Sequence, residues 1–311
     1  MGPITVGFTD FWRADDEAAI RAHPLFRLLG KRFDLRLSPD PQFLLYSCYG
    51  AEFTRYRCPR IFYCSENLRA DFSQCDYAFT FDYPADERSH RLPLYVLYDL
   101  DALFEARNAE ALHAQKSRFC AFVYSNPRAS ARIEFMRKLS RYKRVDSGGG
   151  LLNNIGWRVE NKIEFMRPYK FSISFENSSW PGYVTEKLPE ALAANTVPIY
   201  WGSPLVEHDF NPRAFVNCHA FRNLDEVVDF VVALDNDDAL YRRYLGEPAF
   251  AGNRPNEFMD ETRILDRFEA IFTTPPARPV ASTFRGSLDR WRYVPRRYMN
   301  HVRAALRGRL R

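Results

Sequence analysis

Short apolar runs alternate with longer polar stretches through the first half of the chain. Several of these runs are continuously apolar rather than alternating with polar residues. Continuous runs are typical of strands that are covered on both faces in a parallel sheet. The runs that predict strands in this half are residues 4–8, 34–37, 43–46, 60–64, 77–81 and 94–97.

A second series of strands and helices is predicted in the other half. The strands fall at residues 119–124, 171–175, 197–201 and 215–216. Helical stretches lie among them, at residues 131–142, 185–194, 225–234 and 238–245. Alternation of strand and helix indicates βαβ units. We therefore expect an α/β fold in which two sheets face each other across a cleft.

Length and composition favour two domains. A chain of 311 residues with 46% hydrophobic residues has enough apolar material for two cores. The Pro-rich stretch 273–280 interrupts the helical pattern before it. We expect an N-terminal domain over residues 1–117, a second domain over 118–272, and a linker with a basic tail over 273–311.

Cysteine spacing and the N-terminal sequence bear on the protein's location. The six cysteines include no CxxC pair, so a zinc ribbon is not expected, and reduced thiols fit the sequence better than a disulfide framework. The first residues lack the basic and apolar regions of a signal peptide, and no run of about 18 apolar residues is present to span a bilayer. We expect a cytoplasmic protein.

Charge is concentrated at the end of the chain. The net charge is +5, but residues 285–311 hold nine Arg and one Asp, which leaves −3 on residues 1–284. A basic segment of this kind is typical of contact with anionic lipid or with nucleic acid, or it is simply a frayed tail. We expect peripheral membrane contact rather than nucleic-acid binding, or packing of the tail on the body.

Residues 169–204 form the densest candidate site. They predict a strand, a loop containing SSWPG, a helix that begins at Glu186 with Thr185 as its cap, and a further strand. Because ligands bind beyond the carboxyl ends of strands, this unit directs several polar side chains toward one place. They are Asn177, Tyr183, Glu186 and Lys187. A helix N-terminus beside Lys187 suits a diphosphate, and Glu186 suits a ribose diol. A solvated Glu–Lys pair is the alternative.

Several motifs resemble the α-1,3/4-fucosyltransferases of glycosyltransferase family 10. The strongest is FENSSWPGYVTEKLPEALAANTVPIYWGSP at 175–204. Others are FCAFVYSNPRASAR at 119–132, VDSGGGLLNNIG at 145–156 and RIFYCSENLRADF at 60–72. The resemblance implies the GT-B arrangement of two Rossmann-like domains and inverting transfer of fucose from GDP-fucose. It also implies an N-acetyllactosamine-type (Lewis-type) glycan acceptor, with the α-1,3 linkage as the family default and α-1,4 left open.

The resemblance also implies roles for single residues. Arg132 falls at the position of a diphosphate-binding arginine, Glu186 at that of the ribose-binding glutamate and Lys187 at that of the phosphate-binding lysine. Asn177 and Tyr183 match further donor-site positions. Glu66 matches the proposed catalytic base, which an inverting transfer needs to take the acceptor proton.

The sequence is also compatible with two other functions, and it contains two weaker motifs. Other readings are a GT-B transferase with a different nucleotide sugar, or a non-catalytic glycan-binding protein. The DLD at 99–101 has a metal-binding spacing, but we expect no metal because cations can neutralise the diphosphate. The SGGG at 147–150 lacks the spacing of a P-loop, and we expect a flexible turn near the donor.

Overall fold

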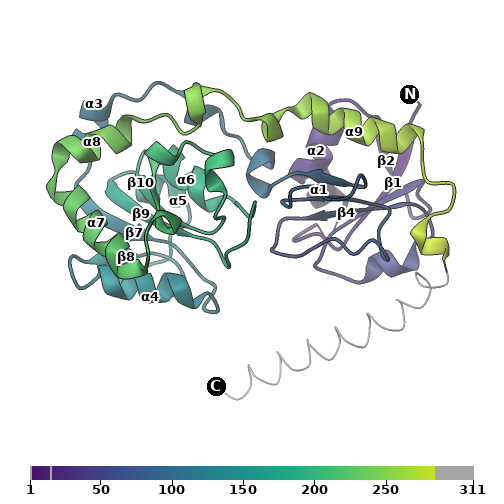
Figure 1. Ribbon diagram of the computed structural model, residues 1–311. Helices are drawn as coiled ribbons and strands as arrows, with labels where there is room; N and C mark the ends of the chain where they lie inside the picture. The colour runs from purple at the N-terminus through teal and green to yellow at the C-terminus, as the bar shows by residue number, and fades with distance from the viewer. Residues whose placement is uncertain (1, 15, 284–311) are drawn as a thin grey trace, which may run out of the picture. The chain divides into compact units, whose positions relative to one another are not determined.

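The computed structural model of the chain describes residues 2–14 and 16–283 (Figure 1). These residues form two units, each around its own parallel sheet. Unit 1 runs to Leu92 and resumes at Asp260, and unit 2 is Pro93–Met259. The basic segment 285–311 lies outside the described residues.

The sheet of unit 1 has six parallel strands in the order β2-β1-β3-β4-β5-β6. The strands are β1 (Ile4–Thr9), β2 (Leu35–Leu37), β3 (Phe43–Tyr46), β4 (Arg60–Cys64), β5 (Tyr77–Thr80) and β6 (Ser89–Arg91). Because β2 and β3 lie on opposite sides of β1, the chain reverses its direction of winding there. Ligands bind beyond the carboxyl ends of strands at such a point, so the segments after β1, β3 and β4 occupy the expected binding edge.

The described residues of unit 1 form three α-helices: α1 (Glu17–Ala22), α2 (Pro24–Gly30) and α9 (Glu261–Thr273). Although α9 comes late in the chain, its apolar face completes the core of this unit. Phe268 stacks on Phe79 with ring centroids 4.0 Å apart, and Phe272 packs edge-on against Phe33 and Phe43. Figure 1 shows α9 running beside α2.

The division of the chain differs from the expected boundaries at 117 and 272. The first lies at Leu92 and the second before Asp260. The stretch after Leu92 packs in unit 2, where Tyr95 donates a 2.7 Å hydrogen bond to Asp209. The aromatic contacts of α9 bring the chain back to unit 1. Sequence spacing cannot show such a return, because it carries no information about which sheet an amphipathic helix covers.

The sheet of unit 2 has five parallel strands in the order β11-β10-β9-β7-β8. The strands are β7 (Arg118–Phe122), β8 (Val145–Ser147), β9 (Tyr169–Phe175), β10 (Val197–Trp201) and β11 (Val216–Asn217). Winding reverses between β7 and β9, which are neighbours in the sheet although β8 separates them in sequence. The α/β prediction is confirmed: each unit is a Rossmann-like domain, as in the GT-B architecture.

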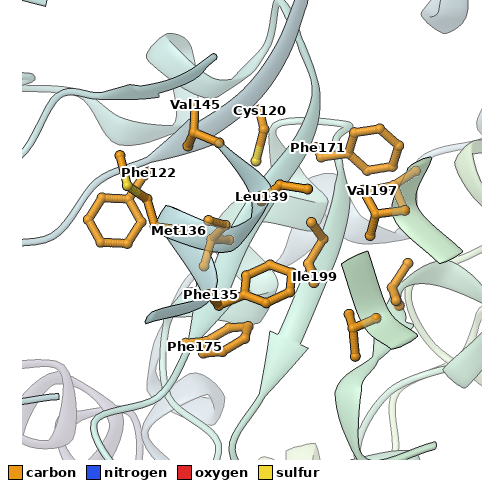
Figure 2. Close-up of a cluster of buried hydrophobic side chains, with 14 of the residues drawn as sticks. Cys120, Phe122, Phe135, Met136, Leu139, Val145, Phe171, Phe175, Val197 and Ile199 are labelled. Carbon is orange, nitrogen blue, oxygen red and sulfur yellow. The ribbon is translucent and has the colours of Figure 1, made fainter. Parts of the chain in front are cut away.

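Helices cover both faces of this sheet. They are α3 (Ala109–Ala114), α4 (Ser130–Leu139), α5 (Lys162–Met166), α6 (Lys187–Ala193), α7 (Leu224–Asn236) and α8 (Asp238–Gly246). Figure 2 shows the larger core, in which Phe135 and Leu139 of α4 pack against Phe171 and Phe175 of β9. The other face of the sheet packs against α5 and α6, for example at Ala191. Burial on both faces explains the continuously apolar strands.

The structure differs from the predicted secondary structure in three places. Residues 94–97, expected as a strand, form a short 3-10 helix, Leu94–Leu97. Pro93 precedes this turn, and Tyr95 packs in a core cluster with Leu188 of α6. A four-residue apolar run fits a strand or a buried helical turn equally well. Strands β6 and β8 were not expected because each has only three residues and a polar sequence.

Candidate active site

The reversal of winding between β7 and β9 opens a site at the carboxyl edge of the unit 2 sheet. The two strands pair as far as Ala121 and Ser172. Further along, the Tyr124 hydroxyl donates to the Ile173 carbonyl at 2.9 Å and accepts from the Phe175 amide at 2.8 Å. Tyr124 thus links the segment after β7 to the end of β9, where the pairing of the two strands has ended.

Arg132 reaches this edge from the first turn of α4. Its Nη2 donates to Asn177 Oδ1 at 2.7 Å, and its guanidinium lies 4.1 Å from the centre of the Tyr124 ring. Within the described residues its Nε has no hydrogen-bond partner. The structure therefore brings Arg132 and Asn177 together and fixes the guanidinium plane. With only 1% of Arg132 exposed, a ligand that binds it requires a neighbouring segment to move.

The loop after β9 is a tight turn. The Tyr183 amide donates to the Trp180 carbonyl at 3.0 Å, and Gly182 has φ 81°. Pro181 followed by a glycine with positive φ is the pattern of a type II turn, so glycine is required here. The Gly182 amide donates to Ser203 Oγ at 2.8 Å. Tyr183 is buried beneath the edge, and its carbonyl accepts from the Tyr200 hydroxyl at 3.3 Å.

Lys187 lies at the centre of a charged cluster. Its Nζ donates to Thr185 Oγ1 at 2.8 Å and to Glu186 Oε1 at 3.1 Å, and it forms an ion pair with Glu176 Oε2 at 3.1 Å. Burial would lower the pKa of Lys187, but the Glu176 and Glu186 carboxylates raise it well above its usual value. The two carboxylates therefore favour the charged form of Lys187.

Glu186 and Glu176 respond differently to the same surroundings. Burial would raise the pKa of Glu186, but Lys187 and then Lys162 lower it to about 2. Burial raises the pKa of Glu176, although Lys187 opposes the change. Glu176 also accepts from the Thr185 amide and hydroxyl, both at 2.7 Å. The cluster thus holds two carboxylates around one buried cation.

The expected helix cap is wrong in detail. The helix begins at Lys187, with Glu186 at the N-cap and no side-chain capping bond. The Thr185 hydroxyl instead donates to Glu176, which takes it away from the helix amides. Glu176 was not among the predicted site residues. The available signal was a carboxylate directly after a continuously apolar strand, where a buried acid needs a partner.

Glu66, the candidate base, lies in unit 1 directly beyond β4. Its Oε1 accepts from the Tyr49 hydroxyl at 3.0 Å. Tyr49 comes from the segment after β3, the strand beside β4. Burial, and then the nearby Glu66 carboxylate, raise the pKa of Tyr49, so the phenol remains a hydrogen-bond donor. The five donor-site candidates of the sequence all lie in unit 2.

The two weaker signals have structural explanations. The glycine run at 147–150 lies against the segment after β7, where a Cβ on Gly149 would lie 2.0 Å from the Tyr124 carbonyl oxygen. Glycine at position 149 is therefore needed for this close backbone approach. Asp99 accepts from the Asp101 amide at 3.2 Å. Within the described residues, no three His, Cys, Asp or Glu side chains gather as a metal site.

Two family profiles match most of the described chain. Residues 113–247 match the C-terminal profile of glycosyltransferase family 10 (fucosyltransferase), and residues 6–98 match the N-terminal domain of the α-(1,3)-fucosyltransferase FucT. The chain belongs to glycosyltransferase family 10. Arg132, Glu186 and Lys187 lie within the range that matches the C-terminal profile, and Glu66 lies within the range that matches the N-terminal one.

Individual relatives agree with this assignment. An α-(1,3)-fucosyltransferase of Helicobacter pylori is 30% identical over 286 residues, covering 79% of this chain and 60% of the relative. A 3-galactosyl-N-acetylglucosaminide 4-α-L-fucosyltransferase of Bos taurus is 32% identical over 42% of this chain and 36% of its own length. The chain thus spans less than two thirds of these relatives. A crystal structure of an α1,3-fucosyltransferase with GDP-fucose has TM-score 0.74 at 29% identity, covering 89% of this chain and 92% of that one.

Proposed function

We propose that the chain is an inverting α-1,3-fucosyltransferase. It would transfer L-fucose from GDP-fucose to an N-acetylglucosamine hydroxyl of an N-acetyllactosamine-type glycan. The observation that carries this proposal is the likeness, over 89% of the chain, to a structure described as an α1,3-fucosyltransferase with GDP-fucose. The 4-α-fucosyltransferase of Bos taurus supports an N-acetylglucosaminide acceptor.

The donor is assigned to the carboxyl edge of the unit 2 sheet. Arg132 offers a planar, partly unpaired guanidinium that suits two phosphate oxygens. Lys187 donates one of its hydrogen bonds to Glu186. If Glu186 turns to accept from the ribose diol, it releases Lys187 for a phosphate oxygen. Binding of the nucleoside and stabilisation of the leaving diphosphate are then coupled through two adjacent residues.

The base is assigned to Glu66. An acceptor hydroxyl attacks well only as its proton leaves, and inversion in one displacement needs a separate group to take that proton. A carboxylate held by the Tyr49 hydroxyl fits this requirement. As the new bond to the anomeric carbon forms, the bond to the diphosphate oxygen breaks. The electron pair leaves with GDP, whose charge Arg132 and Lys187 stabilise.

The test is an assay of the purified protein with GDP-fucose and N-acetyllactosamine in excess EDTA, with linkage analysis of the product. We expect transfer to persist under chelation, because the cationic side chains take the place of a metal. Glu66→Gln should lower transfer by roughly 10²–10⁴ while GDP binding, measured by titration, stays close to wild type. Transfer from a different nucleotide sugar but not from GDP-fucose would refute the proposal, and loss of transfer in EDTA would refute its metal-free form.

A further inference from the structure

An exposed tryptophan stands at the binding edge of unit 1. The segment after β1 carries Phe11 and Trp12 in succession, and their surroundings are opposite. Phe11 is buried and stacks on Phe8 with centroids 3.8 Å apart. Trp12 is 64% exposed, the largest exposed fraction among the large hydrophobic side chains of the described residues. Exposing an indole to water is unfavourable, so this position calls for an explanation.

Hydrogen bonds hold the backbone just before Trp12 in a defined conformation. Asp10 has φ 62°, in the left-handed region that is unfavourable for a residue with a Cβ. Its carboxylate accepts from the amides of Glu52 at 3.1 Å and Phe53 at 2.9 Å, which fixes this conformation. Because Asp10 is hydrogen-bonded to the segment after β3 and Phe11 packs on Phe8, the two residues that precede Trp12 are held in place, and Trp12 faces outward.

Trp12 connects directly to the candidate base. Its ring lies 5.3 Å from the ring of Tyr49, tilted by 50°. The hydroxyl of the same Tyr49 donates to Glu66 at 3.0 Å. Three neighbouring segments of the sheet, after β1, β3 and β4, thus contribute an exposed indole, a phenol and a carboxylate in a continuous row. The Arg13 guanidinium lies 5.9 Å from the centre of the Trp12 ring, which still leaves much of the indole exposed.

We propose that Trp12 and Tyr49 form a stacking platform for the acceptor sugar, and that Tyr49 also positions Glu66. A pyranose has an apolar face of C–H groups and a polar rim of hydroxyls, so it covers an aromatic surface and still presents a hydroxyl at the edge of the ring. The row ends at a carboxylate that can accept that hydroxyl's proton. This inference rests on the proposed function and names the residues that hold its acceptor.

The first test uses Trp12→Ala, with Trp12→Phe as the conservative variant. We expect Trp12→Ala to raise the KM for N-acetyllactosamine about tenfold. The KM for GDP-fucose and the rate of GDP-fucose hydrolysis without acceptor should remain within about twofold of wild type. Trp12→Phe should recover most of the acceptor affinity. Trp157→Ala removes another exposed tryptophan, 57% exposed and in unit 2, and serves as the matched control.

The second test separates positioning from stacking. Tyr49→Phe keeps the ring but removes the hydrogen bond to Glu66, which stabilises the ionised carboxylate. We expect kcat to fall about tenfold with little change in acceptor KM, and the acid limb of the kcat/KM profile to move to higher pH. Titratable groups that interact with Glu66 include Tyr49, Cys48 and Cys64. A profile that superimposes on that of wild type would overturn the positioning role.

Direct binding makes the platform testable apart from catalysis. Saturation-transfer NMR with N-acetyllactosamine should show contact with the wild-type protein and with Trp157→Ala, and much weaker contact with Trp12→Ala. Equal contact in Trp12→Ala, or equal increases of donor and acceptor KM, would exclude the platform. If the wild type binds the glycan but does not transfer from GDP-fucose, the proposed function fails while the platform stands.

Discussion

At the scale of single residues, Lys187 shows how one side chain can serve both stability and chemistry. Its ammonium group donates hydrogen bonds to Thr185 and Glu186 and forms an ion pair with the fully buried Glu176. Removing one partner of a buried ion pair leaves an uncompensated charge, whereas removing both is far less costly. The structural and catalytic contributions of Lys187 can therefore be separated.

We predict that Lys187→Ala destabilises the protein by about 3–5 kcal/mol and lowers kcat/KM by roughly 10²–10³. The loss of stability arises because Glu176 is left buried without its cation. The loss of kcat/KM arises because the leaving diphosphate is no longer stabilised by Lys187. Adding Glu176→Gln should restore much of the unfolding free energy, measured by urea denaturation, without restoring transfer. Recovery of transfer in the double variant would show that Lys187 acts only through stability.

At the scale of elements, His23 lies between α1 and α2 in unit 1 and caps both helices. Its amide donates to the Ile20 carbonyl at the end of α1, and its Nδ1 accepts from the Leu25 amide at the start of α2. The ring also packs edge-on against Phe8 and Phe11. Burial lowers the pKa of His23 to about 4. A neutral ring is needed both to accept the capping bond and to remain among the aromatic side chains.

We predict that acid weakens this junction. In the unfolded chain His23 binds a proton near pH 6.5, whereas in the folded protein it does so only near pH 4. Stability is therefore retained above pH 6.5 and falls as the pH drops from 6.5 to 4, by about 3 kcal/mol at most. His23→Asn keeps an N-cap acceptor but does not titrate. Thermal unfolding of the variant should show a smaller loss between these pH values, and equal losses would contradict this account.

At the scale of the whole molecule, charge is the feature that sequence supplies most directly. Residues 285–311 carry a net charge of +8 against −3 for the remainder. Among the described residues, no helix has the length and apolar character needed to cross a bilayer. From the charge of residues 285–311 alone, we propose that the protein contacts the cytoplasmic surface of a membrane through this basic segment. Each arginine close to an anionic surface contributes up to about 1 kcal/mol.

The corresponding prediction concerns vesicles. The full chain should sediment with vesicles containing phosphatidylserine but not with purely zwitterionic ones, and binding should weaken as salt rises. A chain that stops at residue 284 should lose this binding and keep transfer to soluble acceptors. Salt-insensitive binding would argue against an electrostatic contact, and an inactive truncated chain would indicate that the segment packs on the body.

Local patterns were sufficient to predict much of the fold. Continuously apolar strands and the helices between them indicated an α/β protein, because burial on both faces of a parallel sheet leaves that mark on the sequence. The order of polar residues after β9 also predicted that Asn177, Tyr183, Glu186 and Lys187 belong to one edge. These features depend on neighbours in the chain, which the sequence contains.

Only the tertiary structure decided what depends on distant partners. The return of α9 to unit 1 depends on Phe79 and Phe43, which lie about 190 to 230 residues earlier in the chain. The role of Thr185 depends on the buried Glu176 across the loop. The row from Trp12 through Tyr49 to Glu66 arises because β1, β3 and β4 are neighbours in the sheet. By itself the sequence determined most of the secondary structure and the family motifs, whereas strand order and burial determined which polar groups meet.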